Sequence, residues 1–173
     1  MSDPLLVTHY KYISIIPFSL LFLPRIFIAA DFVTFTEKIN QKEYIKKYIK
    51  SYMLFFSFLS IIIFSLSYVF SDSILLIFGE QYVKYSDSFL ILIFGVTGIF
   101  ILRGLFGNLL SSIGKMSVNY YIVSAALIIN IISNYYLISR YGIKGAAITS
   151  CILMWFTGLL SWICFNYLYK NKD

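Results

Sequence analysis

One arginine lies inside a long apolar stretch, where a charge is costly. Arg103 lies 12 residues before Lys115, which is roughly 18 Å along a helix that rises about 1.5 Å per residue. In a bilayer this depth is close to the middle, where an arginine costs about 2.5–3.5 kcal/mol on insertion scales. A guanidinium binds phosphate oxygens in a bidentate way and stays charged at any working pH. We interpret Arg103 either as an anion contact lining a cavity or as a structural arginine that bonds helix carbonyls or snorkels.

Other polar residues in apolar stretches are weaker candidates. Arg25 follows Pro24, where a helix is expected to kink and to free carbonyl groups; close to a membrane edge Arg25 would instead snorkel. Asn130 and Asn134 are four residues apart and share a helix face, while Asn108 lies in the same stretch as Arg103. The three asparagines predict either a hydrophilic path or hydrogen bonds between neighbouring helices.

Other kinds of chemistry have little support in the sequence. With one histidine and no Cys/His spacing, we expect no metal site. Cys151 and Cys164 are 13 residues apart in one expected helix, or about 20 Å, so they are interpreted as packing residues. We see no nucleophile with a base and no glycine-rich phosphate loop, and we expect neither an enzyme nor a cofactor.

The composition indicates that lipid is the solvent of this chain. It is 60% hydrophobic and only 13% charged, with a mean hydropathy of +0.82, whereas soluble domains carry about 25% charged residues. The net charge is +6, but the basic residues are not gathered on a soluble domain. Anionic lipid headgroups are therefore the expected partner, and nucleic acid is not.

The hydrophobic pattern predicts an all-α integral membrane bundle of about five transmembrane helices, forming one domain over residues 1–173. The expected spans are 12–32, 52–70, 88–113, 116–138 and 145–169. A tight turn between the last two spans is predicted at Gly142 and Gly145.

The connector 34–51 is predicted to be an amphipathic helix. Thr34 and Glu37 fit a capping box that would start it, and Lys42, Lys46 and Lys50 follow at helical spacing. We interpret this helix as lying on the cytoplasmic leaflet; the alternative is a solvated linker.

The distribution of Lys and Arg predicts the orientation. Eight lie in connectors on one side and four on the other, which places the N-terminus outside and the C-terminus in the cytoplasm. The segment Met1–Tyr12 lacks a basic region ahead of its first apolar run, so no signal peptide is expected.

Three motifs carry a resemblance to a known family. They are Asn134 with Leu137–Ala147 (LISRYGIKGAA), Leu76–Tyr82 (LIFGEQY) and Leu110–Lys115 (LSSIGK). Together they resemble the oligosaccharide flippases of the polysaccharide biosynthesis family, which share a superfamily with lipid II flippases and drug/cation antiporters (the MATE-like exporters). The family usually has Pro where Ser139 stands.

The resemblance implies a function and a partial lobe. Family members have about a dozen helices in two lobes, and the match runs from near the eighth to the twelfth, so a truncated or split frame is expected. The missing N-terminal lobe, as a separate chain, is then a further partner to look for. The implied function is translocation of a lipid-linked oligosaccharide, an O-antigen or capsule repeat unit on polyprenyl pyrophosphate, across the bacterial inner membrane. Arg103 would then contact the pyrophosphate, Arg25 would line the substrate cavity, and Asn108, Asn130 and Asn134 would contact the sugar hydroxyls.

Two alternatives stay open at this point. One is a fragment of a membrane-embedded polysaccharide polymerase or ligase, although the expected outward loop Ser71–Asp87 holds no Arg or His. The other is a non-transporting remnant of a degraded transporter gene. An intramembrane carboxylate for ion coupling is not seen in the second to fifth spans.

Overall fold

The computed structural model describes the backbone of residues 4–170 and the side chains of residues 6–170. Over this range the chain is helical, which confirms the predicted fold class. The elements are α1 (Pro4–Leu20), α2 (Phe22–Glu37), α3 (Lys42–Leu76), the 3₁₀ helix η1 (Glu80–Tyr85), α4 (Ser86–Gly98), the π-helix η2 (Ile99–Arg103), α5 (Gly104–Ser112), α6 (Met116–Tyr141) and α7 (Ile143–Lys170).

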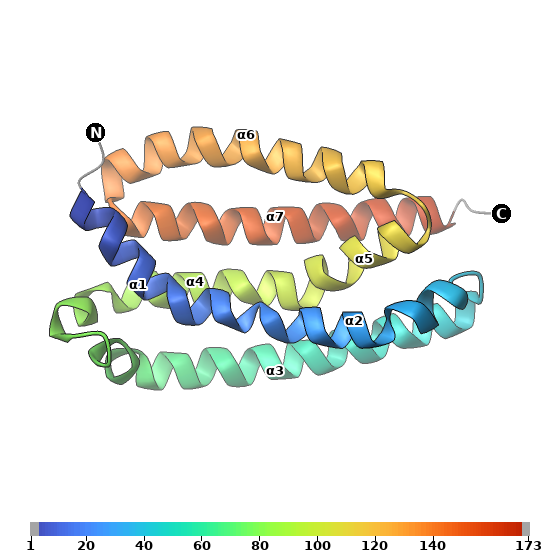
Figure 1. Cartoon of the computed structure of the whole chain (residues 1–173), viewed down its shortest axis with the longest axis horizontal. Coiled ribbons are helices and arrows are strands. Elements are labelled where there is room, and N and C mark those ends of the chain that lie inside the picture. The colour runs from blue at the N-terminus through green and yellow to red at the C-terminus, as the bar shows by residue number, and fades with distance from the viewer. Residues whose placement is uncertain (1–3, 171–173) are drawn as a thin grey trace.

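Five stretches within the described residues are long and apolar enough to cross a membrane. They are Leu6–Glu37, Lys42–Leu76, Glu80–Ser112, Met116–Tyr141 and Ile143–Lys170. Figure 1 shows them running alongside one another: the start of α1, the α3–α4 connector and the α6–α7 turn lie at one end, and the α2–α3 connector, the α5–α6 connector and the end of α7 at the other. Successive spans therefore alternate in direction.

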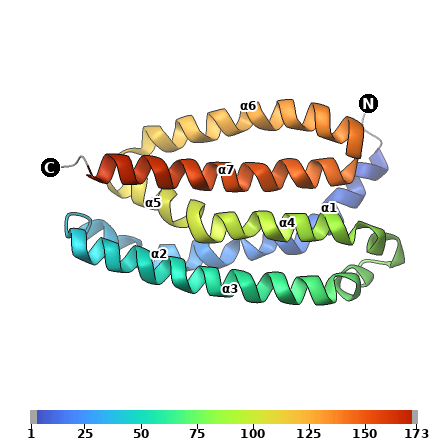
Figure 2. The same cartoon turned by 180° about the vertical axis from the view of Figure 1, so that it is seen from behind.

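The third span is the centre of the bundle and α6 is its margin. In the most apolar window of Glu80–Ser112, 61% of residues are buried inside the protein, against 6% for Met116–Tyr141. Seen from behind, α7 lies between α6 and α4 (Figure 2). The apolar part of the third span is thus largely covered by other helices, whereas most of α6 faces outward.

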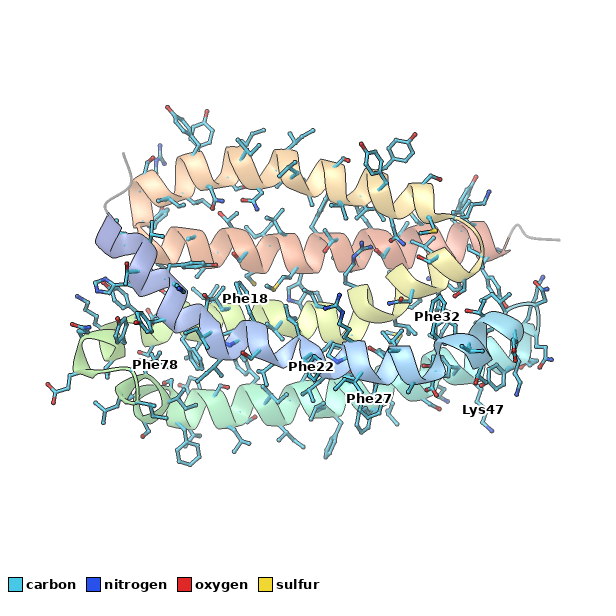
Figure 3. All side chains as sticks on the ribbon, viewed as in Figure 1. Phe18, Phe22, Phe27, Phe32, Lys47 and Phe78 are labelled. Atoms are coloured by element: carbon cyan, nitrogen blue, oxygen red, sulfur yellow. The ribbon has the colours of Figure 1, made fainter. Side chains whose placement is uncertain are left out.

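The first span is broken where the sequence places prolines. Pro24 lies in the first turn of α2, where its missing N–H costs no helical hydrogen bond. The backbone N–H of Leu21 instead bonds the carbonyl of Phe18 at 3.1 Å, in a tighter turn that joins α1 to α2. Phe18, Phe22, Phe27 and Phe32 mark the path of the two helices in Figure 3.

The helix start predicted at Thr34 is wrong. Thr34 lies in the last turn of α2, where its carbonyl accepts the N–H of Lys38 at 3.1 Å, and α3 begins only at Lys42. From there α3 continues without interruption to Leu76. Thr34 and Glu37 match the capping pattern, but the apolar run of α2 already holds this segment in a helix.

The apolar face of the predicted connector packs inside the protein. Ile45 is fully buried and Tyr52 nearly so, both in one core cluster with Phe35 of α2. The Tyr169 hydroxyl of α7 donates to the carbonyl of Ile39 at 2.7 Å, which fastens the α2–α3 connector to the end of the last helix. The basic face stays outside, and Lys47 points away from the bundle in Figure 3.

The α6–α7 turn is a single residue. Gly142 separates the two helices with φ of 56°, in the left-handed region that disfavours other residues, and its N–H bonds the carbonyl of Ile138 at 2.9 Å. At Gly145 the backbones approach so closely that an added Cβ would overlap the Leu137 carbonyl. The tight turn predicted from the two glycines is confirmed.

Candidate functional site: a polar cluster around Arg103

Arg103 ends a π-helical turn between two α-helical segments of the third span. The turn η2 spans Ile99–Arg103 and joins α4 to α5. Gly158 of α7 lies against it, because a Cβ at Gly158 would lie 3.0 Å from Leu102 Cβ and 3.1 Å from the Gly98 carbonyl oxygen. Wide turns of this kind occur frequently at functional sites.

The guanidinium of Arg103 bonds two neutral side chains on different helices. Its Nη1 donates to Asn119 Oδ1 on α6 at 2.8 Å and to Ser161 Oγ on α7 at 2.5 Å. Ser161 is fully buried and donates in turn to the Thr157 carbonyl at 2.8 Å. Asn119 Nδ2 donates to the Gly107 carbonyl at 2.7 Å. The cluster therefore joins the third, fourth and fifth spans.

The guanidinium keeps unused donors and an uncompensated charge. Of its five N–H donors, those on Nε and Nη2 have no partner within residues 6–170, and no carboxylate there forms an ion pair with Arg103. Nε and Nη2 form the planar edge that binds phosphate or carboxylate in a bidentate way. Arg103 as a whole is half-buried. The neighbouring helices thus hold Nη1 and leave the other edge of the guanidinium without a protein partner among residues 6–170.

Arg25 is not part of this cluster. Its side chain lies on the exposed surface of α2, and it forms no hydrogen bond or ion pair with the described part of the chain. Asp31, further along α2, accepts a hydrogen bond from the Tyr48 hydroxyl at 3.2 Å instead. Arg25 and Arg103 therefore lie in different surroundings.

Asn108 bonds within its own helix. Its side chain donates to the Gly104 carbonyl at 2.7 Å, and its backbone carbonyl accepts the Ser112 hydroxyl at 3.1 Å. Ser112 also bonds Thr36 at 3.0 Å, which links α5 to α2. The described contacts of Asn108 fit helix packing better than ligand binding.

Asn130 and Asn134 lie together at a cavity. Asn134 Nδ2 donates to Asn130 Oδ1, and both residues line a cavity of about 750 Å³ between α1, α6 and α7. On its other side Tyr10 and Ser150 share a hydrogen bond of 2.8 Å. The sequence predicted Asn130 and Asn134 as candidates, whereas Tyr10 of α1 and Ser150 of α7 emerge only from the structure.

Asn119 and Ser161 were missed by the sequence reasoning. Asn119 precedes Asn130 by eleven residues, three helical turns with an offset of about 20°, so the two share one face of α6. That spacing was a usable signal. Ser161 had none, because a hydroxyl four residues after Thr157 in an apolar helix is unremarkable; its role follows only from the packing of α7 against η2.

The Cys, His, Asp and Glu side chains of the described residues neither hydrogen-bond Arg103 nor line the cavity at Asn130. No group of three His, Cys, Asp or Glu side chains suited to a metal ion occurs among the described residues. Cys151 and Cys164 are free thiols, as expected of packing residues.

Comparison with known proteins identifies the family. Residues 39–136, more than half of the chain, match the MatE family. A capsular polysaccharide biosynthesis protein, CapF, of Staphylococcus aureus is 37% identical over 97 residues, which cover 56% of this chain and 23% of that relative. The match thus spans less than a quarter of the relative's length, and no solved structure matches the chain significantly. The family match confirms the resemblance seen in the motifs: the chain belongs to the MatE family.

Proposed function

We propose that this chain is part of a membrane carrier that moves a lipid-linked oligosaccharide, an O-antigen or capsule repeat unit on polyprenyl pyrophosphate, across the bacterial cytoplasmic membrane. The observation that carries the proposal is the free Nε–Nη2 edge of Arg103, inside the third span and without a carboxylate partner among the described residues. The family match and the capsular relative support it. The role is that of a carrier, and no enzymatic step is assigned.

The proposed mechanism follows from the cost of moving charge through lipid. The negative oxygens of a pyrophosphate cannot enter hydrocarbon unless a polar group receives them. Arg103 supplies a permanent positive charge and a bidentate edge, while Asn119 and Ser161 hold Nη1 so that this edge is already oriented. Arg25 has no such support and is assigned no role.

Transport itself requires more helices than the five described here. Carriers of this type open a central cavity to each side in turn, as two lobes rock against each other. The five spans form part of one lobe, and α6, whose apolar window is only 6% buried, lies at its margin. The remaining helices belong to the rest of the protein or to a separate chain.

The orientation is proposed from charge. Lys38, Lys42, Lys46, Lys47 and Lys50 gather at the α2–α3 end, which also carries Lys115 and Lys170. This end faces the cytoplasm and contacts anionic lipid headgroups in the proposal. The N-terminus and the α6–α7 turn then face outward.

The test is binding of polyprenyl pyrophosphate to the purified chain in lipid nanodiscs. Arg103→Gln should weaken binding about ten- to a hundredfold, since hydrogen bonds to charged groups contribute about 1.5–3 kcal/mol. Arg25→Gln is the matched control, because it removes an equal charge from the exposed surface of α2. Equal affinities of the two variants would refute the role of Arg103.

A further inference from the structure

The cavity between α1, α6 and α7 has the size and lining of a ligand pocket. Its volume is about 750 Å³, within the range of about 300–1,000 Å³ found for small-molecule sites. Most of its wall is apolar, and the polar groups come from three helices: Tyr10, Asn130, Asn134, Ser139 and Ser150. An apolar wall with a few convergent polar groups is the usual composition of a binding site.

The two asparagines present unused hydrogen-bonding groups side by side. Asn134 Nδ2 donates its hydrogen bond to Asn130 Oδ1. Asn130 Nδ2 and Asn134 Oδ1 have no partner among the described residues, so a donor and an acceptor remain next to each other. A hydroxyl group both donates and accepts, and this pair therefore matches hydroxyl groups.

The uncharged lining of the cavity disfavours ions as ligands. None of its lining residues carries a charged side chain, so an anion entering it would lose water without gaining a counter-charge. The ligand that fits is neutral and rich in hydroxyls. Tyr135 and Phe18 of the wall add aromatic surface for its apolar faces.

We propose that this cavity binds neutral sugar residues, and that it receives the saccharide of the cargo while Arg103 receives its pyrophosphate. The second half of this statement rests on the proposed function. Asn119 at Arg103 and Asn130 at the cavity lie on one face of α6, about 16 Å apart along the helix. The cargo then lies along α6 with its sugars toward the α6–α7 turn.

The experiment compares two lipids in nanodiscs prepared without sugar-headed detergents. One is bare polyprenyl pyrophosphate, and the other carries a neutral trisaccharide of N-acetylglucosamine. The wild-type chain should bind the trisaccharide lipid about tenfold more tightly, in keeping with two additional hydrogen bonds. Replacing both amides together, Asn130→Leu with Asn134→Leu, should abolish this preference and leave the affinity for the bare lipid unchanged.

Two further variants keep the test decisive. Tyr10→Phe removes one hydroxyl of the cavity and keeps the ring, so it should reduce the preference several-fold even if the double variant does not fold. Asn166→Leu makes the same exchange on the exposed surface of α7, away from the cavity, and should keep the full preference.

The results that would contradict the sugar pocket differ from those that would contradict the pyrophosphate contact. If the wild type binds both lipids equally, or if the double variant and Tyr10→Phe keep the preference, the sugar pocket is refuted. If Arg103→Gln does not weaken binding of the bare lipid, the proposed pyrophosphate contact is refuted, independently of the result for the trisaccharide lipid.

Discussion

Removing the charge of Arg103 should cost the fold little, although the residue lies in the centre of the bundle. Arg103→Met forfeits the hydrogen bonds to Asn119 and Ser161, and interhelical bonds in membranes average about 0.6 kcal/mol with a maximum near 1.7. The exchange also removes an intramembrane charge that costs about 2.5–3.5 kcal/mol. Since Ser161 keeps its bond to Thr157, only Asn119 Oδ1 loses its partner. The free energy of unfolding should therefore fall by no more than about 1 kcal/mol.

The converse variant should be far more harmful. Asn119→Leu leaves the guanidinium with one partner and removes the bond to the Gly107 carbonyl. Weakening the hydrogen bonding of a polar group inside the protein costs about 1–3 kcal/mol, so a loss within this range is expected. In the double variant, Arg103→Met with Asn119→Leu, removal of the charge should recover part of the lost unfolding free energy. Reversible unfolding in mixed micelles, followed by circular dichroism, measures all three. A loss of 3 kcal/mol or more in Arg103→Met would make the arginine a structural support and refute the reasoning.

Three other predictions concern packing, charge and completeness. Gly145→Ala places a Cβ against the Leu137 carbonyl and should cost about 1–3 kcal/mol from overpacking, whereas helix propensity alone predicts a gain of about 1 kcal/mol. Gly107→Ala is the less crowded comparison, because its Cβ would lie 3.2 Å from Arg103 Nη1 and 3.6 Å from Asn119 Oδ1 and would meet no backbone atom this closely. The same micelle unfolding decides the sign of the Gly145 effect. Asp87→Asn breaks the 2.8 Å ion pair between Asp87 and Lys144. Because the side chain of Asp87 is 73% exposed and that of Lys144 is 49% exposed, the unfolding free energy should change by less than about 1 kcal/mol. A larger loss would mean that the pair is shielded from water. Expressed alone in a strain that lacks its flippase, the chain should not restore surface polysaccharide, because part of one lobe cannot enclose a two-sided cavity; restoration would show that these spans suffice.

Hydrophobic length and turn chemistry made most of the fold predictable. Charge-free stretches marked α6 and α7 within a few residues, and Gly142 marked the turn between them. The connector 34–51 was harder, because Thr34 and Glu37 satisfy a capping pattern inside α2. Ile45 and Tyr52 lie on the helix that was interpreted as resting on the cytoplasmic leaflet, but both pack against other helices. Periodicity gives the direction of an apolar face, and only the packing of the other helices decides what covers it.

Arg103 of the candidate site could be predicted from the sequence, whereas its hydrogen-bond partners could not. Arg103 stood out because an intramembrane charge is rare and costly. Its partners Asn119 and Ser161 come from spans that are distant in sequence, and only the approach of α6 and α7 to η2 brings them together. Arg25 and Asn108 drew attention for the same polar character, yet the first lies on the exposed surface of α2 and the second bonds its own helix.

The most direct test of the central claim is to locate the bound headgroup. A polyprenyl pyrophosphate analogue with a photoreactive group beside the pyrophosphate is bound to the chain in nanodiscs, irradiated, and its adducts are mapped by mass spectrometry. We expect adducts on η2 and on the segments of α6 and α7 that carry Asn119 and Ser161, suppressed by excess unlabelled lipid. Adducts spread along the exposed surface of α3, or unaffected by the competitor, would contradict the account.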